Sequence, residues 1–177
     1  MPQPYPAHLV SHWQAPDGTR VVIRPIRPED ADIEREFVAS LSPEARYMRF
    51  MTTIKELSPE MLARFTRIDY EREMALIAVV TQNEREIQIA VARYVMQPDG
   101  ESCEFAIVVA AHWQGRGLGQ HLMLLLIALA RARALKSMTG QIFAANVQML
   151  GLARAMGFTV EDAPHEPAIK HVRLTMR

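Results

Sequence analysis

A glycine-spaced segment, Gln114 to Gly119, lies between an apolar run typical of a buried strand and a longer stretch typical of a helix. Glycines at positions 115, 117 and 119 allow backbone N–H groups to approach a ligand without interference from Cβ atoms. A helix that begins here adds unpaired N–H donors and the positive end of its dipole. Arg116 adds a formal charge. The segment therefore predicts an anion site suited to a pyrophosphate.

Two better-known phosphate-binding motifs do not match this segment. The dinucleotide fingerprint G-x-G-x-x-G lacks its third glycine, because Gln120 stands in that place. The P-loop needs Gly-Lys followed by Ser or Thr, and the segment has no lysine. On the local pattern alone, a glycine-rich turn that binds nothing stays open as the alternative.

Length and composition restrict the class of protein. The chain has 177 residues, which suits one compact domain with a sizeable core. Hydrophobic residues make up 49% and charged residues 23%, as in globular proteins and unlike disordered ones. The 20 Lys and Arg residues are balanced by 20 Asp and Glu residues, whereas nucleic-acid-binding proteins normally have a basic excess. We therefore expect no nucleic-acid partner.

Signals for secretion, membrane insertion and metal binding are missing from the sequence. The first residues show neither a cationic nor an apolar signal-peptide region. The most apolar run, Leu122 to Ala130, is far shorter than the about 20 residues of a membrane span. Cys103 is the only cysteine, and the six histidines show no metal-ligand pattern. We expect a cytoplasmic protein with no membrane association, no disulfide and no metal.

Periodicity and turn residues divide the chain into an arm and one α+β domain. Residues 1–18 contain four prolines and are expected to form an irregular arm, followed by a single domain over 19–177. Pro28, Ser42-Pro43-Glu44 and Ser58-Pro59-Glu60 each predict the start of a short helix. Longer helices are expected over 117–134 and 146–156. The expected strands are 20–24, 74–80, 87–95, 103–109, 142–144, 159–161 and 169–176.

The glycine-spaced segment matches the Q/R-x-x-G-x-G/A acyl-CoA motif of the GNAT superfamily of N-acetyltransferases. The preceding run, Phe105 to Val109, resembles the fourth strand of that family, and Asn146 with Gly157-Phe158 resembles its N…GF ending. The resemblance extends over residues 20–176. It implies a GNAT fold: a mixed central sheet of about seven strands, a splayed fourth and fifth strand pair, and flanking helices.

A closer resemblance is to the acetyltransferase domain of Pat-type protein lysine acetyltransferases. It is carried by the segments Arg24 to Asp30, Leu41 to Phe50 and Asp69 to Leu76. Members of that family often carry this domain fused to acyl-CoA-synthetase-like or cyclic-nucleotide-binding domains. The resemblance implies an acetyl-CoA-dependent enzyme whose acceptor is a lysine of a partner protein, usually an acyl-CoA synthetase.

Glu104 is the candidate general base. A lysine at pH 7 must lose a proton before it attacks, which costs about 5 kcal/mol given a pKa near 10.4. Glu104 shares one strand face with Ala106 and Val108, so these small apolar neighbours are expected to desolvate its carboxylate and strengthen it as a base. The resemblance places the general base of Pat-type enzymes at this position. The alternative is an edge carboxylate paired with an arginine.

The resemblance also implies the cofactor contacts. A bulge in the fourth strand would separate it from the fifth, so that pantetheine inserts like an extra strand. Backbone groups of Ile107, Val108 and Val109 would bond the pantetheine amides, and a freed N–H near Val109 would bind the thioester oxyanion. The pyrophosphate would be held by the glycine-spaced segment: Gln114, Gly115, Arg116, Gly117, Leu118 and Gly119.

Two positions in the last predicted helix complete the expected site. Asn146 would help hold CoA, with a helix N-cap as its alternative role. Many relatives place a tyrosine seven residues later as a general acid, where this chain has Ala153. No general acid is therefore assigned, which the chemistry tolerates because a thiolate is a stable leaving group.

The acceptor leaves two other functions open. One is acetylation of a small amine such as an amino acid or a polyamine, and the other is an acyl-CoA-binding module with little turnover. Glu104 argues against the second. For a protein acceptor, docking by surface charge could use four arginines of the first helices, although solvated helix faces are the ordinary explanation for such residues: Arg46, Arg49, Arg64 and Arg67.

Overall fold

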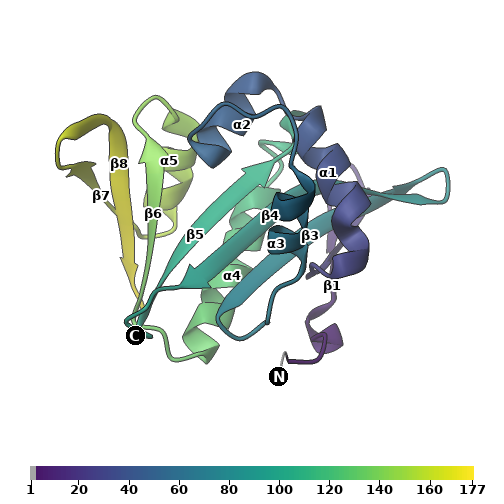
Figure 1. Ribbon diagram of the computed structural model, residues 1–177, viewed down its shortest axis with the longest axis horizontal. Helices are drawn as coiled ribbons and strands as arrows, with labels where there is room; N and C mark the ends of the chain where they lie inside the picture. Colours follow the sequence, from purple (N-terminus) through teal and green to yellow (C-terminus); the bar gives the residue numbers. More distant parts are fainter. Residues whose placement is uncertain (1–2) are drawn as a thin grey trace.

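The apolar run from Met74 to Val80 lies at the centre of an eight-stranded sheet in the computed structural model, which describes residues 3–177 (Figure 1). This run forms most of strand β3, and every residue in it is buried. Helices cover both faces of the sheet, which is why the run shows no polar alternation. The prediction of a central strand buried on both faces is confirmed.

The sheet has the order β1-β2-β3-β4-β5-β6-β8-β7. All neighbours are antiparallel except β5 and β6, which run parallel and are connected through a crossover that contains helix α4. The strands are β1 (Ser11–Gln14), β2 (Arg20–Pro25), β3 (Glu73–Gln82), β4 (Arg85–Met96), β5 (Ser102–Val109), β6 (Ser137–Phe143), β7 (Thr159–Ala163) and β8 (Glu166–Thr175).

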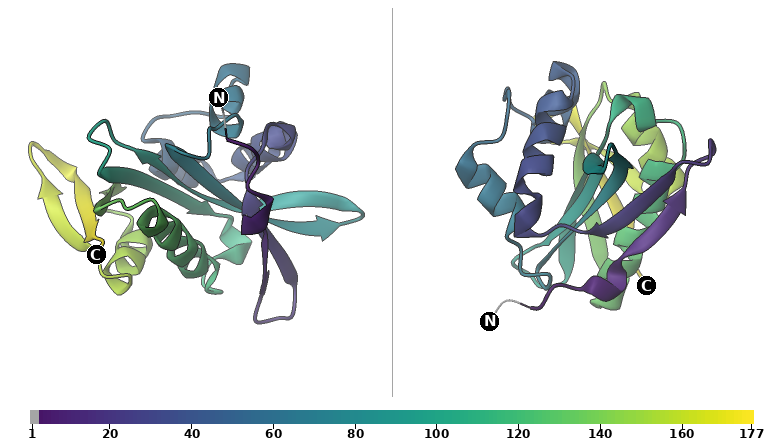
Figure 2. Two further views of the ribbon diagram at one scale, coloured as in Figure 1. Left: turned by 90° about the horizontal axis from the view of Figure 1, so that it is seen from below. Right: turned by 90° about the vertical axis from the view of Figure 1, so that its right-hand side faces the viewer.

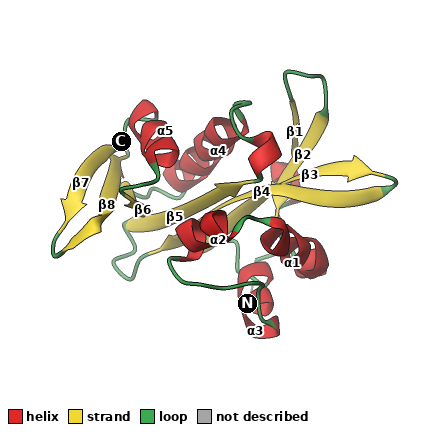
Figure 3. Cartoon of the chain, turned by 90° about the horizontal axis from the view of Figure 1, so that it is seen from above, coloured by secondary structure: helices red, strands yellow, loops and turns green. Residues whose placement is uncertain are grey.

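The helices form two layers. Figure 3 shows α1, α2 and α3 on one face of the sheet and α4 and α5 on the other, and Figure 2 shows the same separation from below. Their bounds are α1 (Ala31–Ser40), α2 (Pro43–Phe50), α3 (Pro59–Thr66), α4 (Leu118–Ala132) and α5 (Val147–Ala155), with short 3-10 turns at Ala7–Leu9, Pro28–Asp30 and Ala111–Trp113.

The predicted helix starts are confirmed by their caps. The Ser42 hydroxyl accepts a hydrogen bond from the Ala45 N–H at 3.1 Å, and the Ser58 hydroxyl accepts one from the Met61 N–H at 3.2 Å. In both helices the next residue is a proline at the first helical position, where a missing N–H costs nothing.

Three details of the sheet differ from expectation. Residues 11–14, expected to belong to an irregular arm, form β1 at the edge of the sheet, which therefore has eight strands instead of about seven. The turn Asp17-Gly18 joins β1 to β2, and this dipeptide was the available signal for a hairpin. Strand β6 begins at Ser137, earlier than expected. The expected bulge in β5 is absent, because its pairing with β4 runs without a register shift.

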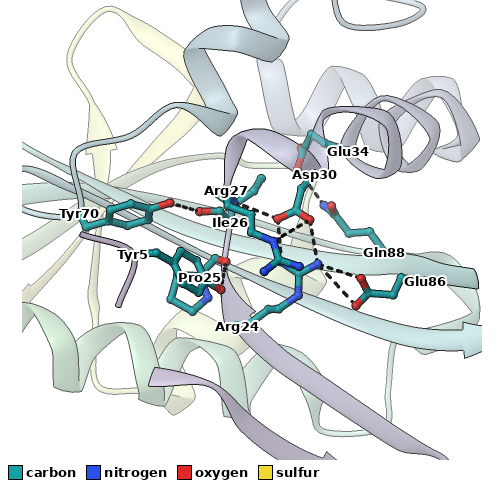
Figure 4. Close-up of polar contacts among 10 residues, drawn as sticks. All are labelled: Tyr5, Arg24, Pro25, Ile26, Arg27, Asp30, Glu34, Tyr70, Glu86 and Gln88. Carbon is teal, nitrogen blue, oxygen red and sulfur yellow. Dashed lines mark hydrogen bonds and ion pairs between the residues drawn. The ribbon is translucent and has the colours of Figure 1, made fainter. Parts of the chain in front are cut away.

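A buried ion pair fixes the start of the domain (Figure 4). Arg24 donates from Nη1 and Nη2 to the Asp30 carboxylate at 2.7 and 2.8 Å, and the two residues are only 5% and 3% exposed. Asp30 also accepts from the backbone N–H of Arg27 at 2.9 Å. Glu86 of β4 approaches Arg24 at 3.3 Å from the solvent side. The charges in the segment Arg24 to Asp30 therefore hold the chain where it leaves the sheet for α1.

Two tyrosines anchor the same segment. The Tyr5 hydroxyl donates to the Pro25 carbonyl at 2.7 Å, and the Tyr70 hydroxyl donates to the Ile26 carbonyl at 2.6 Å. Their rings meet edge to face with centroids 5.8 Å apart. Hydrogen bonds from Tyr5 and Tyr70 thus fix the backbone of the segment Arg24 to Asp30 beside its buried ion pair.

No helix among residues 3–177 is long and apolar enough to cross a membrane.

Candidate active site

Strands β5 and β6 pair over only three residues and then separate. Ser102, Cys103 and Glu104 of β5 lie opposite residues 137–139 of β6, and no further pairs follow. Figure 1 shows the two strands diverging toward the C-terminal end of β5, whereas β5 stays paired with β4 up to Val109. The splayed strand pair is confirmed, and it arises here without a bulge.

The separation leaves backbone groups of β5 without a strand partner. The Ala110 N–H bonds the Ile89 carbonyl of β4, so by alternation the backbone groups of Ile107 and Val109 point toward β6. Val108 therefore bonds toward β4, contrary to the expectation that three successive residues would face the gap. The exposed edge of β5 offers two residues to an extended ligand that would complete the sheet.

A cleft of about 700 Å³ occupies the gap between the diverging strands. Its lining comes from both layers of helices as well as from β5 and β6. The lining residues are Ser42, Glu44, Ala45, Met48 and Arg49 of the α2 region; Phe105 to Val109; Gln114, Gly115, Gly117, Gly119 and Gln120; Gln141 and Ile142; and Ala145 to Met149 with Leu152.

The glycine-spaced segment follows β5 and lines the open end of the cleft. Gly115 and Gly117 have φ values of 74° and 92°, a conformation that favours glycine, and α4 begins directly afterwards. Gly119 lies inside the first turn, where an added Cβ would sit 3.6 Å from Leu152 and 3.7 Å from Val109. The start of α4 thus directs unpaired N–H groups toward the cleft, an arrangement that fits a pyrophosphate.

Three side chains of this segment offer no hydrogen-bond donor to a ligand in the cleft. The Gln114 amide donates to the Val109 carbonyl at 3.0 Å, so it supports the edge of β5. The Arg116 guanidinium pairs with Asp17 at 3.1 Å and stacks over Trp113 at 4.7 Å, outside the cleft lining. Leu118 is fully buried in the core. Only the backbones of Arg116 and Leu118 are available to a ligand in this arrangement.

Glu104 lies at the closed end of the cleft, just outside its lining. It occupies the last paired position before β5 and β6 separate, opposite Val95 and Thr139. Alternation places it on the α1–α3 face with Ala106 and Val108, as expected. The expected desolvation is not found, because the strands part beside Glu104 and its side chain is exposed to solvent.

Asn146 has the geometry of its alternative role. Its Oδ1 accepts a hydrogen bond from the Met149 N–H at 3.2 Å, which makes it the N-cap of α5. Asn146 also lines the cleft, so its remaining polar groups face the space that a ligand would fill. Ala153, where relatives have tyrosine, is buried in the core.

The sequence did not predict the contribution of α2 to the site. Glu44, Met48 and Arg49 line the cleft, and Glu44 is the only carboxylate to do so among residues 3–177. Helix α2 packs against β5, which brings these side chains over the diverging strands. These residues belong to the segment Leu41 to Phe50, and a helix so far along the chain from β5 carries no local signal of contact with it.

The arginines expected to dock a partner have other roles in three cases. Arg46 donates to the backbone carbonyls of Ala39 and Ile54 at 3.2 and 3.0 Å, so it braces the ends of α1 and α2. Arg64 pairs with Glu73 at 2.8 Å. Arg49 faces the cleft, and only Arg67 is exposed without such an engagement.

The chain belongs to the GNAT acetyltransferase family. Residues 20–159 match the family model described as "Acetyltransferase (GNAT) domain". The chain is 38% identical over 157 residues to Acetyltransferase PA5475 of Pseudomonas aeruginosa, which covers 88% of this chain and 84% of that protein. It is therefore similar over most of its length to a protein named as an acetyltransferase.

Two solved structures show the same fold. The GNAT domain of S. lividans PAT superposes with a TM-score of 0.86 at 26% identity and covers 98% of this chain and 100% of that one. The Salmonella typhimurium protein yncA, solved with acetyl-CoA, superposes with a TM-score of 0.65 at 19% identity, covering 89% of this chain and 94% of that one. At that identity the second likeness concerns the fold alone.

Proposed function

We propose that this enzyme moves an acetyl group from acetyl-CoA to the side-chain amine of a protein lysine, by direct attack in a ternary complex. The observation that carries the proposal is the partner-free edge of β5. It runs from the glycine-spaced segment at its open end to Glu104 at its closed end. Acetyl transfer from a nucleotide thioester needs an anion site for the phosphates at one end and a base near the acyl group at the other.

The residues present fit acetyl-CoA. Gly115 and Gly117 in left-handed conformations, together with the start of α4, would hold the pyrophosphate. The backbone groups of Ile107 and Val109 would bond the pantetheine amides, and Asn146 lies where it would contact the same molecule. Bound acetyl-CoA supplies an activated thioester. The Ile107 N–H, which has no strand partner and lies nearer to Glu104 than Val109 does, would then stabilise the oxyanion.

Glu104 is proposed as the general base. Val109 and Glu104 are five residue steps apart, about 16 Å of extended strand, so a pantetheine arm that follows β5 from the glycine-spaced segment extends toward Glu104. The carboxylate lies on the α2 side of the sheet, from which an acceptor would approach. Desolvation would then come from the bound acceptor, since the free protein leaves Glu104 exposed. Glu44 is the competing candidate, because it lines the cleft itself.

The choice of a protein lysine is supported by likeness and by shape. The Pat domain of S. lividans is similar over the whole chain at 26% identity. The cleft also adjoins a groove of about 740 Å³ along α2 and the end of β6, and Glu44, Met48 and Ala145 line both. An acceptor presented by a folded partner needs such an open approach, whereas a small free amine does not.

Mass spectrometry of candidate acceptors tests the proposal. The enzyme and acetyl-CoA are incubated with purified acetyl- or propionyl-CoA synthetase and, separately, with a panel of free amines. We expect a single lysine of the synthetase to gain an acetyl group. Efficient acetylation of a free amine, with every synthetase lysine unmodified, would replace the protein acceptor by a small molecule.

A matched pair of variants tests the base. Glu104→Gln should lower turnover about 10²–10⁴-fold with unchanged acetyl-CoA affinity, and higher pH should partly restore it because more acceptor amine is then neutral. Glu44→Gln is the comparison. A normal rate in Glu104→Gln with a large loss in Glu44→Gln would move the base role to Glu44.

Cofactor binding is tested by calorimetry on folded protein. Gly117→Glu adds a bulky anion beside the proposed pyrophosphate and strains a backbone whose φ of 92° favours glycine, so acetyl-CoA affinity should fall by at least about tenfold. Gly151→Glu on the exposed side of α5, where an added Cβ meets no atom within 4 Å, is the matched control. Equal affinities of the two variants would remove the phosphate assignment.

A further inference from the structure

Arg49 lines the cleft, and no carboxylate of residues 3–177 forms an ion pair with it. It lies in the last turn of α2, and its guanidinium stacks over the Phe50 ring at 4.8 Å and near the Phe65 ring at 6.0 Å. Among residues 3–177 its side chain makes no hydrogen bond or ion pair, although it is partly buried. Aromatic stacking holds the group in place but leaves its N–H donors unused.

A second buried cation stands behind it. Arg93 of β4 is only 6% exposed and stacks over the Phe65 ring at 4.6 Å. Its one hydrogen bond runs to the Phe65 carbonyl at 3.3 Å, and its Nε has no partner among the described residues. Two guanidinium groups therefore share one phenylalanine ring beside the cleft.

The charges around this pair do not balance. Glu34 is the carboxylate that acts on both guanidinium groups, and it is buried with its own hydrogen bond from Gln88 at 2.9 Å. Arg64 and Glu73 form a separate pair near Arg93 and cancel each other. Burial, with Arg93 nearby, lowers the pKa of Arg49 to about 10, so Arg49 stays charged at neutral pH. The group of charges around Phe65 thus has one positive charge in excess.

We infer that Arg49 binds a carboxylate that the acceptor carries close to its reactive amine. This inference rests on the proposed acetyl transfer and specifies the acceptor's chemistry. The planar guanidinium matches a carboxylate in two parallel hydrogen bonds, and stacking on aromatic rings leaves that edge free. Two sources can supply such a carboxylate: an acidic residue next to a protein lysine, or a free amino acid.

The position of Arg49 favours the acceptor over the phosphates of CoA. Arg93, which lies behind it, is opposite Ala106 in the β4–β5 register, at the middle of β5. The glycine-spaced segment begins beyond Val109, about 10 Å farther along the strand, and its helix lies on the other face of the sheet. Glu44 faces the same cleft about 7.5 Å away along α2, so the wall presents both signs of charge, as an acceptor with an ammonium and a carboxylate requires.

Binding of paired probes to the CoA-saturated enzyme tests the inference. One pair consists of blocked peptides with a single lysine followed by Glu or by Gln, and the other consists of lysine and lysinamide. The parent enzyme should bind the carboxylate member of at least one pair about 10- to 100-fold more tightly. The pair that responds identifies the source of the carboxylate. Equal affinities within both pairs, or no binding of any probe, would overturn the inference.

Variants separate recognition from a structural role of the stacked arginine. Arg49→Gln should abolish the carboxylate preference, whereas Arg131→Gln, at an exposed position in the last turn of α4 on the other face of the sheet, should keep it. Arg49→Lys should retain part of the preference, because charge remains without the planar fork. A preserved preference in folded Arg49→Gln would refute the inference. Acetylation of the same probes is measured in parallel, so that selective binding without turnover would count against the proposed function alone.

Discussion

Replacing Asp30 with asparagine should destabilise the fold more than any other single loss of charge in the Figure 4 network. The substitution keeps the shape of the side chain but removes the charge that neutralises buried Arg24. It also puts an amide NH₂ where one carboxylate oxygen accepted at 2.7 or 2.8 Å. With the amide oxygen in the Oδ2 position, the bonds from Arg24 Nη1 and from the Arg27 N–H can persist, but the bond from Arg24 Nη2 is lost.

The size of the effect follows from burial. Breaking a buried pair by removing one partner typically costs about 3–5 kcal/mol, because the remaining charge is left without compensation. Glu86 lies 3.3 Å from Arg24 and compensates in part, although its side chain is 44% exposed and solvent screens it. We therefore expect about 3 kcal/mol, the lower end of the range. For a chain of this size that corresponds to a fall in melting temperature of roughly 10 °C.

Urea unfolding at pH 7 provides the measurement, with Glu86→Gln as the matched control. The control removes the exposed partner of the same arginine and should cost less than about 1 kcal/mol. The slope of unfolding free energy against urea must be the same in all three proteins for the comparison to report stability. Equal costs for Asp30→Asn and Glu86→Gln would refute the argument that burial decides the value of each contact.

Three further outcomes are expected. Gly140→Ala should destabilise by about 1–3 kcal/mol in urea unfolding, because the added Cβ would lie 2.6 Å from the buried Phe105 ring; an unchanged midpoint would contradict this contact. Burial raises the pKa of the Cys103 thiol to about 12, so iodoacetamide at pH 8 should label only unfolded protein, and labelling of native protein at the unfolded rate would disagree. The same shift contributes stability that is complete below pH 9.0 and is lost as pH rises toward 12. Arg116→Gln should change acetyl-CoA affinity less than about fivefold in calorimetry, since Arg116 engages Asp17 outside the cleft; a loss as large as that of Gly117→Glu would place the charge at the phosphates.

The sequence predicted those features that depend on neighbours along the chain. Met74 to Val80 was predicted as a central strand because an unbroken apolar run has few other solutions in a folded domain. Ser42 and Ser58 marked helix starts because a capping hydroxyl bonds an N–H only three residues away. The glycine-spaced segment indicated an anion site for the same reason: its conformation and the helix after it are local properties.

The tertiary structure decided which side chains meet. Glu104 has the predicted strand and face, yet it is exposed because β5 and β6 part beside it, and the strength of that pairing is not encoded near position 104. Arg116 and Arg49 also show that position along the chain does not determine which side chains reach the cleft. Arg116, beside the glycines in sequence, turns to Asp17 of a distant hairpin, whereas Arg49, from a helix far along the chain, faces the cleft. Periodicity fixes the face of an element on which a side chain lies, but its partner depends on burial and on the packing of segments that the chain brings together only when it folds.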